Sequence, residues 1–478
     1  MTSSFMERMT HYIVSTTYEN LSPEIIKISK FAIIDTVAVA LAGWNEPSVE
    51  VVKKTYLNKS TNDAMASIWG ESEQVPLEYA ALINGTATHA LDFDDVTPTI
   101  LAHPSAPIVA SIFTLGEYLE KSSKEVLTAY VVGTEVMIIV GKVMGFKHYD
   151  LGWHATSTLG TIGATAACGL LMGLDKETLQ NAIAISASMA GGLQKNFGTM
   201  TKPLHVGLAA KHAIQSVLLA KEGLTGNKEV FEERGFLQAY TGSESFEHLA
   251  EIMKDVTFGG QHDYEVNGLS VKKFPCCYFN HRFIAGMLEI RKENNIKLDD
   301  VVQINVSVPP NGLSALIHHR PTTGLQGKFS AEYTCLAALE DGEIQLNSFT
   351  DRMVQRDKIQ KLFGIVQLEE YDGEITDSEE IEKLPVYVSV KTKEGTVIEK
   401  VIQHAPGSKG KPMNLEEYAA KWSDCLSFAC DYNVDIKLKN QMDRLFQQGL
   451  EMENLHSIKE WIRNIIDFMS EGKKEHVM

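Results

Sequence analysis

The sequence predicts a mainly α protein, in which a large all-helical domain is built from both chain ends and a smaller α+β domain is inserted between them. Changes in hydrophobic spacing carry this prediction. Apolar residues recur with helical spacing up to about residue 268, alternate in several segments between 269 and 402, and recur with helical spacing again from residue 414 onward. A chain of 478 residues is also long enough for more than one domain. We therefore expect residues 1–268 and 403–478 to form the helical domain and residues 269–402 to form the inserted α+β domain.

The first half of the chain carries helix signals. Ser22 is a preferred N-cap residue, Pro23 suits the first helical position, and this helix should end at Gly43. Several segments are apolar on nearly every side, as helices in the centre of a large bundle are. These segments are 31–42, 131–140, 158–171 and 179–190. The uncharged segment 155–174 is long enough to span a membrane, but it is rich in Gly, Ala and Thr, so a buried helix of a soluble protein fits it better.

The middle of the chain carries strand signals. Valine and isoleucine alternate with polar residues over 302–308, and Pro309 and Pro310 then end the pattern. A second alternating segment, 386–390, is followed by Glu394-Gly395, which predicts a hairpin with a return strand through residue 401. Between these segments a helix is expected over 330–339, ending at Gly342. The helices expected after the inserted domain are 414–422, 436–450 and 455–469.

Charge and cysteine content limit the possible functions. The net charge of −18 argues against binding to nucleic acid or to an anionic membrane surface. The first residues carry Glu7 and Arg8 where a signal peptide needs an apolar core, so we expect a cytoplasmic protein. The six cysteines have neither the pattern of a secreted disulfide framework nor that of an iron–sulfur cluster.

The stretch 84–105, NGTATHALDFDDVTPTILAHPS, is the most informative part of the sequence. It contains His89, His103, Asp92, Asp94 and Asp95 within an otherwise apolar environment. Buried ionisable groups gather at functional sites, and histidine is well suited to proton transfer near neutral pH. The alternative is structural, with the aspartates capping a helix and His-Pro-Ser forming a turn. A metal site is a further alternative, although no HExxH or CxxC pair is present.

Four other polar residues stand out. His154 begins the uncharged Gly/Ala/Thr segment, where a histidine of the packed core is the simpler interpretation. Lys202 lies between apolar helices and must reach water or neutralise an anion. Lys272 and His281 lie near the expected domain junction, a common place for ligands. With no nucleotide-binding or nucleophile-elbow motif, this set suits a small polycarboxylate, because lysines bind carboxylates and histidines transfer protons.

At these residues the chain resembles the MmgE/PrpD family, which includes 2-methylcitrate dehydratase, cis-aconitate decarboxylase and iminodisuccinate epimerase. The resemblance extends from IIDTVAVALAG (33–43) to GSKGKPM (407–413). Its most specific blocks are NGTATHALDFDD with HPS, GWHATSTLG, TKPLHVGLAAKHA and KKFPCC. It implies a helical domain with an inserted α+β lid, an active site in the cleft between them, a homodimer, and no metal or other cofactor.

The resemblance also implies site residues. Asp92, His103, His154, Lys202 and Lys272 match the family blocks and are expected to be catalytic. The residues expected to bind substrate are Lys202, Lys272, Thr97, His89 and His281. Two departures put the substrate in doubt: HATST replaces the His-Pro-Pro context of cis-aconitate decarboxylase, and the loop 95–103 differs, so that Thr97 is matched only approximately.

Two enzymatic hypotheses follow. The first is a metal-independent lyase that acts on a small di- or tricarboxylate by dehydration or decarboxylation, with the lysines holding carboxylates, His103 and His154 transferring protons, and Asp92 orienting one ring. The second is an epimerase or racemase of an amino- or iminodicarboxylate such as iminodisuccinate. Both begin with chemistry at a carbon next to a carboxylate, so the sequence separates them poorly. A non-enzymatic scaffold leaves the buried lysines and histidines without a role.

Overall fold

The computed structural model describes residues 3–57, 65–373 and 383–474 and confirms the mainly α fold class. The chain divides into two compact units. The first contains Met1–Lys195, Met200–Leu269 and Leu415–Met478, and the second contains Asn196–Thr199 and Ser270–Asn414. The sequence placed the return to the helical domain at residue 403, whereas the second unit continues to Asn414.

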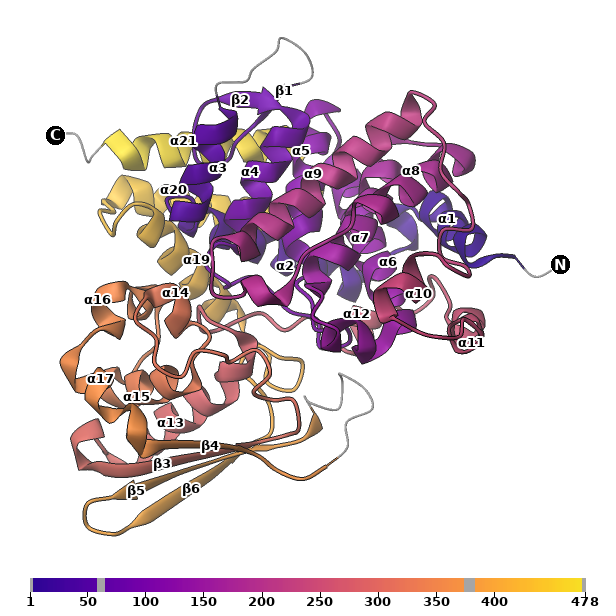
Figure 1. Ribbon diagram of the computed structural model, residues 1–478. Coiled ribbons are helices and arrows are strands. Elements are labelled where there is room, and N and C mark those ends of the chain that lie inside the picture. Colours follow the sequence, from indigo (N-terminus) through magenta and orange to yellow (C-terminus); the bar gives the residue numbers. More distant parts are fainter. Residues whose placement is uncertain (1–2, 58–64, 374–382, 475–478) are drawn as a thin grey trace. The chain divides into compact units, whose positions relative to one another are not determined.

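Among the residues that the structure describes, the first unit has one short hairpin besides its helices and loops (Figure 1). Its N-terminal helices are α1 (Phe5–Ser15), α2 (Pro23–Ala42), α3 (Pro47–Tyr56), α4 (Leu77–His89), α5 (Ser105–Tyr118) and α6 (Ser123–Asp150). They are followed by α7 (Ala155–Met172), α8 (Lys176–Met189), α9 (Thr201–Lys221), α10 (Phe236–Thr241), α11 (Glu247–Asp255) and α12 (Asp263–Val266). The C-terminal helices are α19 (Leu415–Ala429), α20 (Ile436–Leu450) and α21 (Ile458–Lys474).

Helix α2 shows how the two chain ends form one unit. The Ser22 hydroxyl accepts a hydrogen bond from the Ile25 amide at 3.1 Å, Pro23 occupies the first turn, and Gly43 follows the last residue, as the sequence predicts. Helices α19 and α20 from the C-terminal segment pack against α2, and α21 packs against α5. In Figure 1 the yellow C-terminal helices accordingly lie among the indigo and purple N-terminal ones.

Two glycines set the distance between α4 and α9. A Cβ atom on Gly85 would lie 3.0 Å from the Gly207 Cα, and one on Gly207 would lie 2.3 Å from the Leu82 carbonyl oxygen. The absence of side chains therefore lets the two helices approach closely. This contact lies one turn from the end of α4, where His89 is, and two residues after His205 in α9. Close helix packing thus brings these two histidines into the same region.

The hairpin of the first unit was not predicted. Strands β1 (Met65–Ser67) and β2 (Gln74–Pro76) pair antiparallel. The Asn84 side chain holds the region in place, because its Oδ1 accepts from the Trp69 amide and its Nδ2 donates to the Ser67 carbonyl oxygen, both at 3.1 Å. Asn84, the first residue of the polar stretch, therefore has a structural role.

Helices α6 and α7 are long and apolar enough to cross a membrane by composition alone. In the structure 94% of the most apolar window of α6 and 89% of that of α7 are buried. Helices that are apolar on all sides occur in the core of large helical proteins as well as in membranes. The segments predicted to be central helices therefore lie in the core of the first unit.

The second unit combines helices with a four-stranded sheet. Its strands are β3 (Val301–Val308), β4 (Val366–Glu370), β5 (Val386–Thr392) and β6 (Val397–Ile402), in the order β4-β3-β5-β6. Strand β4, which the sequence did not predict, runs parallel to β3, and the other pairs are antiparallel. Its helices are α13 (His281–Asn294), α14 (Gly324–Gly327), α15 (Ala331–Asp341), α16 (Asp351–Val354) and α17 (Asp357–Leu362). Figure 1 shows α13 and α15 on one face of the sheet.

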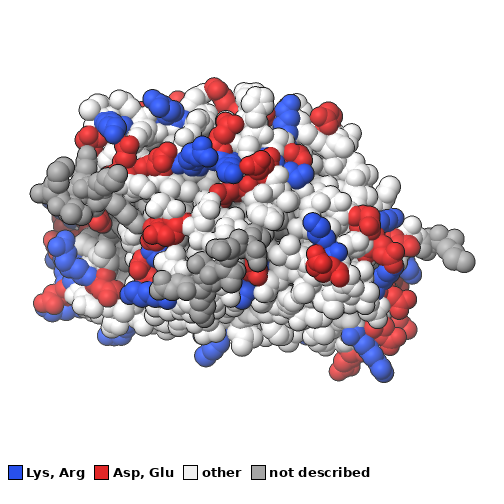
Figure 2. Space-filling model, turned by 90° about the horizontal axis from the view of Figure 1, so that it is seen from above, with Lys and Arg blue, Asp and Glu red and all other residues white. Residues whose placement is uncertain are grey.

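Charged side chains of both signs lie on the face of the molecule that Figure 2 shows. On the face shown in Figure 2, Lys and Arg side chains lie among Asp and Glu side chains. Over the whole chain the 62 acidic residues outnumber the 44 basic ones.

Candidate active site

Four histidines from separate segments of the first unit gather in one buried cluster. His89 ends α4, His103 precedes α5, His154 is the N-cap residue of α7, and His205 is the fifth residue of α9. The His89 ring centroid lies 4.6 Å from that of His103 and 5.6 Å from that of His154. The rings of His154 and His205 are 5.4 Å apart. His103 and His154, predicted from distant parts of the sequence, therefore both lie beside His89.

Asp94 is the carboxylate that contacts two of these rings. Its Oδ2 lies 2.8 Å from the Nδ1 of His89 and 3.2 Å from the Nδ1 of His103. The sequence interpretation gave the orienting role to Asp92, whose Oδ1 is 3.8 Å from the Nε2 of His103. Asp94, which lies two residues further along the same DFDD motif, makes the closer contact with His103. The motif signals a buried carboxylate, but side-chain direction decides which of its aspartates meets the histidines.

Burial sets the protonation states around Asp94. Desolvation alone would raise the pKa of Asp94, but its interactions with the His89 and His103 rings outweigh this effect and hold the pKa well below its usual value. Desolvation lowers the pKa of His89 to about 3, against the opposing pull of the Asp94 carboxylate. At neutral pH His89 is therefore a neutral imidazole that donates its Nδ1 proton to an ionised Asp94.

His154 and His205 form a second histidine pair. Their Nδ1 atoms are 3.2 Å apart, so one ring donates and the other accepts, and the two rings must be opposite tautomers. Desolvation lowers the pKa of His154 well below its usual value, with the charges of nearby groups adding to the effect. Desolvation and the charge of Lys202 lower the pKa of His205 to about 4. Both rings are thus neutral at physiological pH.

Lys202 meets an anion within the protein. Its Nζ lies 2.5 Å from the Oδ1 of Asp92, and both side chains are at least 94% buried. Asp92 has a left-handed backbone conformation, with a φ of 52°, which a short polar residue tolerates better than most. The predicted requirement that Lys202 neutralise an anion is therefore met at least in part by Asp92.

Asp95 directly follows Asp94 in the chain, but the pKa of its carboxyl group is shifted in the opposite direction. Its carboxyl group accepts a hydrogen bond from the Ser105 hydroxyl, which also contacts the Tyr130 hydroxyl at 2.6 Å. Desolvation, opposed by the Ser105 hydrogen bonds, raises the pKa of Asp95 to about 8. Adjacent aspartates are therefore ionised and neutral at pH 7, and Asp95 fixes the start of α5 directly after His103.

The raised pKa of Asp95 gives a stability prediction. A carboxyl group in an unfolded chain titrates near pH 4, so between pH 4 and 8 the folded state holds a proton that the unfolded state has lost. The free energy of unfolding should therefore fall as pH rises from 6.5 to 8, by up to about 1.4 kcal/mol per pH unit for one such group. Asp95→Asn should give a shallower fall in urea denaturation across this range. Glu135, whose pKa burial also raises to about 8, accounts for the slope that remains. An unchanged slope in Asp95→Asn would mean that Asp95 is ionised in the folded protein.

Two buried polar atoms of this region have no hydrogen-bond partner: the Nε2 of His89 and the Oγ1 of Thr97. Buried polar groups are normally hydrogen-bonded, so such exceptions are expected where a ligand binds. Thr97 lies in the loop between Asp92 and His103, which is closed by a hydrogen bond from the Thr97 amide to the Ala102 carbonyl oxygen at 2.8 Å. Both atoms are candidates for contact with a bound substrate.

The other two predicted site residues belong to the second unit. Lys272 and His281 are both fully buried. His281 is the first residue of α13, and its ring lies 5.2 Å from those of Phe274 and Tyr278. That Lys272 shares a pocket with Lys202, and that His281 contacts substrate, stay predictions.

Four residues of the cluster also have the geometry of a metal-binding group. Ligand atoms of His89, Asp92, Asp94 and His103 lie within 4.8 Å of one another. All four residues belong to the stretch 84–105, for which the sequence left a metal site as an alternative. However, the Lys202 ammonium already occupies the Oδ1 of Asp92, and a cation there opposes the binding of a second one.

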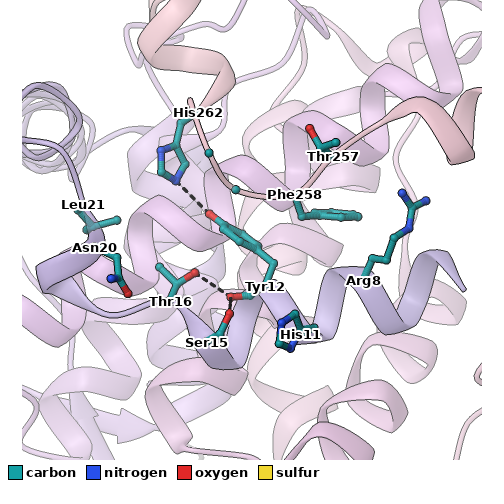
Figure 3. A pocket seen from close by; sticks show the side chains of 12 residues that line it. Arg8, His11, Tyr12, Ser15, Thr16, Asn20, Leu21, Thr257, Phe258 and His262 are labelled. Carbon is teal, nitrogen blue, oxygen red and sulfur yellow. Dashed lines mark hydrogen bonds between the residues drawn. The ribbon is translucent and has the colours of Figure 1, made fainter. Parts of the chain in front are cut away.

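A separate cavity of about 490 Å³ lies between α1 and residues 257–262 (Figure 3). The Tyr12 hydroxyl projects from α1 to the Nε2 of His262 at 3.2 Å, and Arg8 lies further along the same helix. None of the histidine cluster lines this cavity. Asp263 directly follows His262 in the chain. It accepts a hydrogen bond at 2.8 Å from Thr99, which is part of the loop between Asp92 and His103.

Two family models match the chain. The MmgE/PrpD N-terminal domain matches residues 7–249, and the MmgE/PrpD C-terminal domain matches residues 274–444. The chain belongs to the MmgE/PrpD family. The first match contains the whole histidine cluster and Lys202, the second contains His281, and Lys272 lies between the two matched regions.

Similar proteins within the MmgE/PrpD family are cis-aconitate decarboxylases. The chain is 29% identical to the cis-aconitate decarboxylase of Homo sapiens over 435 residues, which cover 88% of each chain. It is 28% identical to that of Mus musculus over 437 residues, or 88% of this chain and 86% of the relative. It is 24% identical to that of Aspergillus terreus over 392 residues, or 77% and 80%. MmgE/PrpD membership together with these relatives supports a lyase-type role.

Proposed function

We propose that this protein is a metal-independent lyase that decarboxylates a small unsaturated tricarboxylate of the cis-aconitate type. The observation that supports this most directly is the histidine cluster, in which neutral imidazoles lie next to an ionised Asp94 and close to Lys202. Acid–base groups around a buried cationic side chain suit proton transfer at a carbon that bears carboxylates. The similarity to cis-aconitate decarboxylases supports the same substrate class.

The proposed reaction has two steps. The bond between the substrate carbon and the departing carboxylate breaks, carbon dioxide leaves, and the electron pair spreads into the remaining conjugated carboxylate system. Lys202 stabilises the negative charge that develops there, and Lys272 holds a further carboxylate. A proton then reaches the carbon from a histidine. His103 suits this role, because the Asp94 carboxylate 3.2 Å from its Nδ1 stabilises a protonated ring.

Dehydration is the main alternative within the lyase class, and epimerisation is the alternative outside it. Both need a base as well as an acid, and the cluster contains a neutral ring, His154, that can accept a proton. Proton NMR in heavy water with a panel of di- and tricarboxylates separates the three reactions. Decarboxylation gives a product with one carbon fewer and one deuteron at the carbon that accepts the proton, which is either the carbon that lost the carboxylate or the far end of the conjugated system. Formation of an alkene with all carbons retained, or deuterium exchange at a stereocentre, would replace the proposal by one of the alternatives.

Metal independence is tested separately. We expect full activity after exhaustive chelation, because the Lys202 ammonium lies against one of the four candidate ligands. The measurement is kcat/KM before and after treatment, combined with the metal content of the purified protein. Loss of activity that one divalent ion restores would show that His89, Asp92, Asp94 and His103 hold a metal.

Substitution of the two lysines tests substrate charge. Lys202→Ala and Lys272→Ala should each lower kcat/KM, because a hydrogen bond to a charged group contributes about 1.5–3 kcal/mol, or roughly one to two decades in rate. Lys273→Ala is the matched control, since Lys273 is the exposed neighbour of the buried Lys272. Wild-type kinetics in both variants on the accepted substrate would place the carboxylate site elsewhere.

We also propose that the protein is a cytoplasmic homodimer that binds neither nucleic acid nor membranes. The net charge of −18 supports the last two points, because nucleic acids and membrane surfaces are also negative. Light scattering of the purified protein measures the oligomeric state directly.

A further inference from the structure

Lys421, from the C-terminal helix α19, reaches the turn that carries the candidate catalytic aspartates. Its Nζ donates a hydrogen bond to the carbonyl oxygen of Phe93 at 2.9 Å, across 328 positions of the chain. The same ammonium lies 3.8 Å from the centroid of the Phe93 ring. Phe93 is the residue between Asp92 and Asp94, so one lysine holds both the backbone and the side chain at the centre of the turn.

Asp35, from α2, completes this arrangement. Its Oδ1 lies 2.7 Å from the Lys421 Nζ, and the two side chains are 2% and 5% exposed. Removing two charged groups from water costs free energy, and the attraction between them often does not offset this cost. Replacing a buried ion pair by apolar residues is therefore often neutral or stabilising. A buried pair that also contacts backbone at a functional turn is therefore better explained by what it positions.

We propose that Lys421, supported by Asp35, is a positioning residue for the Asp92–Asp94 turn. The turn needs such support because Asp92 has a φ of 52°, a conformation that costs energy for a residue with a side chain. The turn also directs two carboxylates differently, Asp92 to Lys202 and Asp94 to His89 and His103. Anchoring the Phe93 carbonyl fixes the point from which both carboxylates project.

The chain offers a matched control. Lys53 is buried, forms an ion pair with Glu71 at 2.6 Å, and lies 5.2 Å from the centroid of the Trp44 ring. Like Lys421, it combines a buried ion pair with a contact to an aromatic ring, although its further partner is the Glu50 carboxylate and not a backbone carbonyl oxygen. These partners of Lys53 are not residues of the histidine cluster. A general effect of removing a buried lysine should appear equally at both sites.

The test uses double variants, because Lys421→Met alone removes the positive charge beside the buried Asp35 carboxylate and can fail to fold. Asp35→Asn/Lys421→Met removes both charges together with the donor to the Phe93 carbonyl, and Glu71→Gln/Lys53→Met is the control. The first readout is hydrogen–deuterium exchange of the peptide that covers residues 90–103. We expect exchange about tenfold or more faster in the first variant and unchanged in the control. Unchanged exchange in a folded Asp35→Asn/Lys421→Met protein would overturn the proposal.

The second readout is kinetic and rests on the proposed function. A displacement of about 1 Å at catalytic groups can lower kcat by about 10²-fold. The first variant should show such a loss, with the alkaline limb of the pH–rate profile moved to lower pH, because a displaced Asp94 stabilises a protonated His103 less. The control should keep the wild-type profile. Exchange does not depend on a substrate, so a wild-type protein inactive on every tested acid would refute the proposed function and leave the positioning test intact. Faster exchange with a wild-type pH–rate profile would show that Lys421 stabilises the turn without positioning the reacting groups.

Discussion

His103→Ala and His154→Ala should each lower kcat by about 10²–10⁴-fold, the usual contribution of one positioned acid–base group. The two rings flank His89 in one buried cluster, so both can reach a substrate bound there. If the two rings transfer protons, kcat should fall with a smaller change in KM. The interaction between a proton-transferring ring and the substrate stabilises the transition state more than it stabilises the bound substrate.

His148→Gln is the control for this prediction. His148 is a buried histidine with a pKa that desolvation lowers to about 4, but it bonds to Thr158 and to the Tyr240 carbonyl oxygen and not to the cluster. Its replacement should reduce stability and leave kcat close to that of the wild type. An equal fall in kcat for all three variants would indicate general disruption, and wild-type kcat in both cluster variants would end the acid–base assignment.

Asp94→Asn should lower kcat to a similar extent, by about 10²–10⁴-fold, since a carboxylate-to-amide change beside a catalytic histidine disturbs both its tautomer and its charge. Asparagine has nearly the same shape as aspartate but cannot stabilise a protonated His103. If His103 is the proton donor, activity is lost when the ring deprotonates, so the alkaline limb of the pH–rate profile should move to lower pH.

Asp92→Asn separates the two aspartates. Asp92 lies 2.5 Å from Lys202 and 3.8 Å from His103, so its replacement should alter KM through Lys202 more than it alters the pH–rate profile. If Asp92→Asn shifts the profile and Asp94→Asn does not, the histidine-orienting role belongs to Asp92, as the sequence alone had suggested.

The sequence predicted the elements whose signals are local. The cap at Ser22, the alternating strand before Pro309 and the helix between Ser330 and Gly342 all depend on neighbouring residues, and the structure contains each of them. Strand β4 and the β1–β2 hairpin were missed because their segments are short and lack clear alternation. The edge strand β4 is positioned by its parallel pairing with β3, about sixty residues earlier in the chain, which local spacing does not reveal.

The candidate site shows the same division. A sequence shows that histidines and aspartates are dense between residues 89 and 103, and that His154 and Lys202 are unusual in apolar surroundings. It does not show that the DFDD motif sends Asp94 to the histidines, Asp92 to Lys202 and Asp95 to Ser105. His205 was overlooked as a partner because its only local signal is one polar residue among the mostly buried residues of α9. The sequence around Lys421 does not indicate its role, because its contact with Asp35 exists only once α19 packs against α2.

The return of the chain end to the first unit has a consequence for biosynthesis. Residues Ser270–Asn414 must leave the ribosome before α19 does, which takes about 7–30 s at the usual rate of about 5–20 residues per second. During that time the surface of α2 that α19 will cover is exposed, and the ion pair between Asp35 and Lys421 has not formed. Nascent chains with uncovered apolar helices are bound by chaperones and prone to aggregation. The candidate active site should therefore form only after translation is nearly complete, and chains truncated before residue 421 should accumulate as chaperone-bound species without the proposed activity.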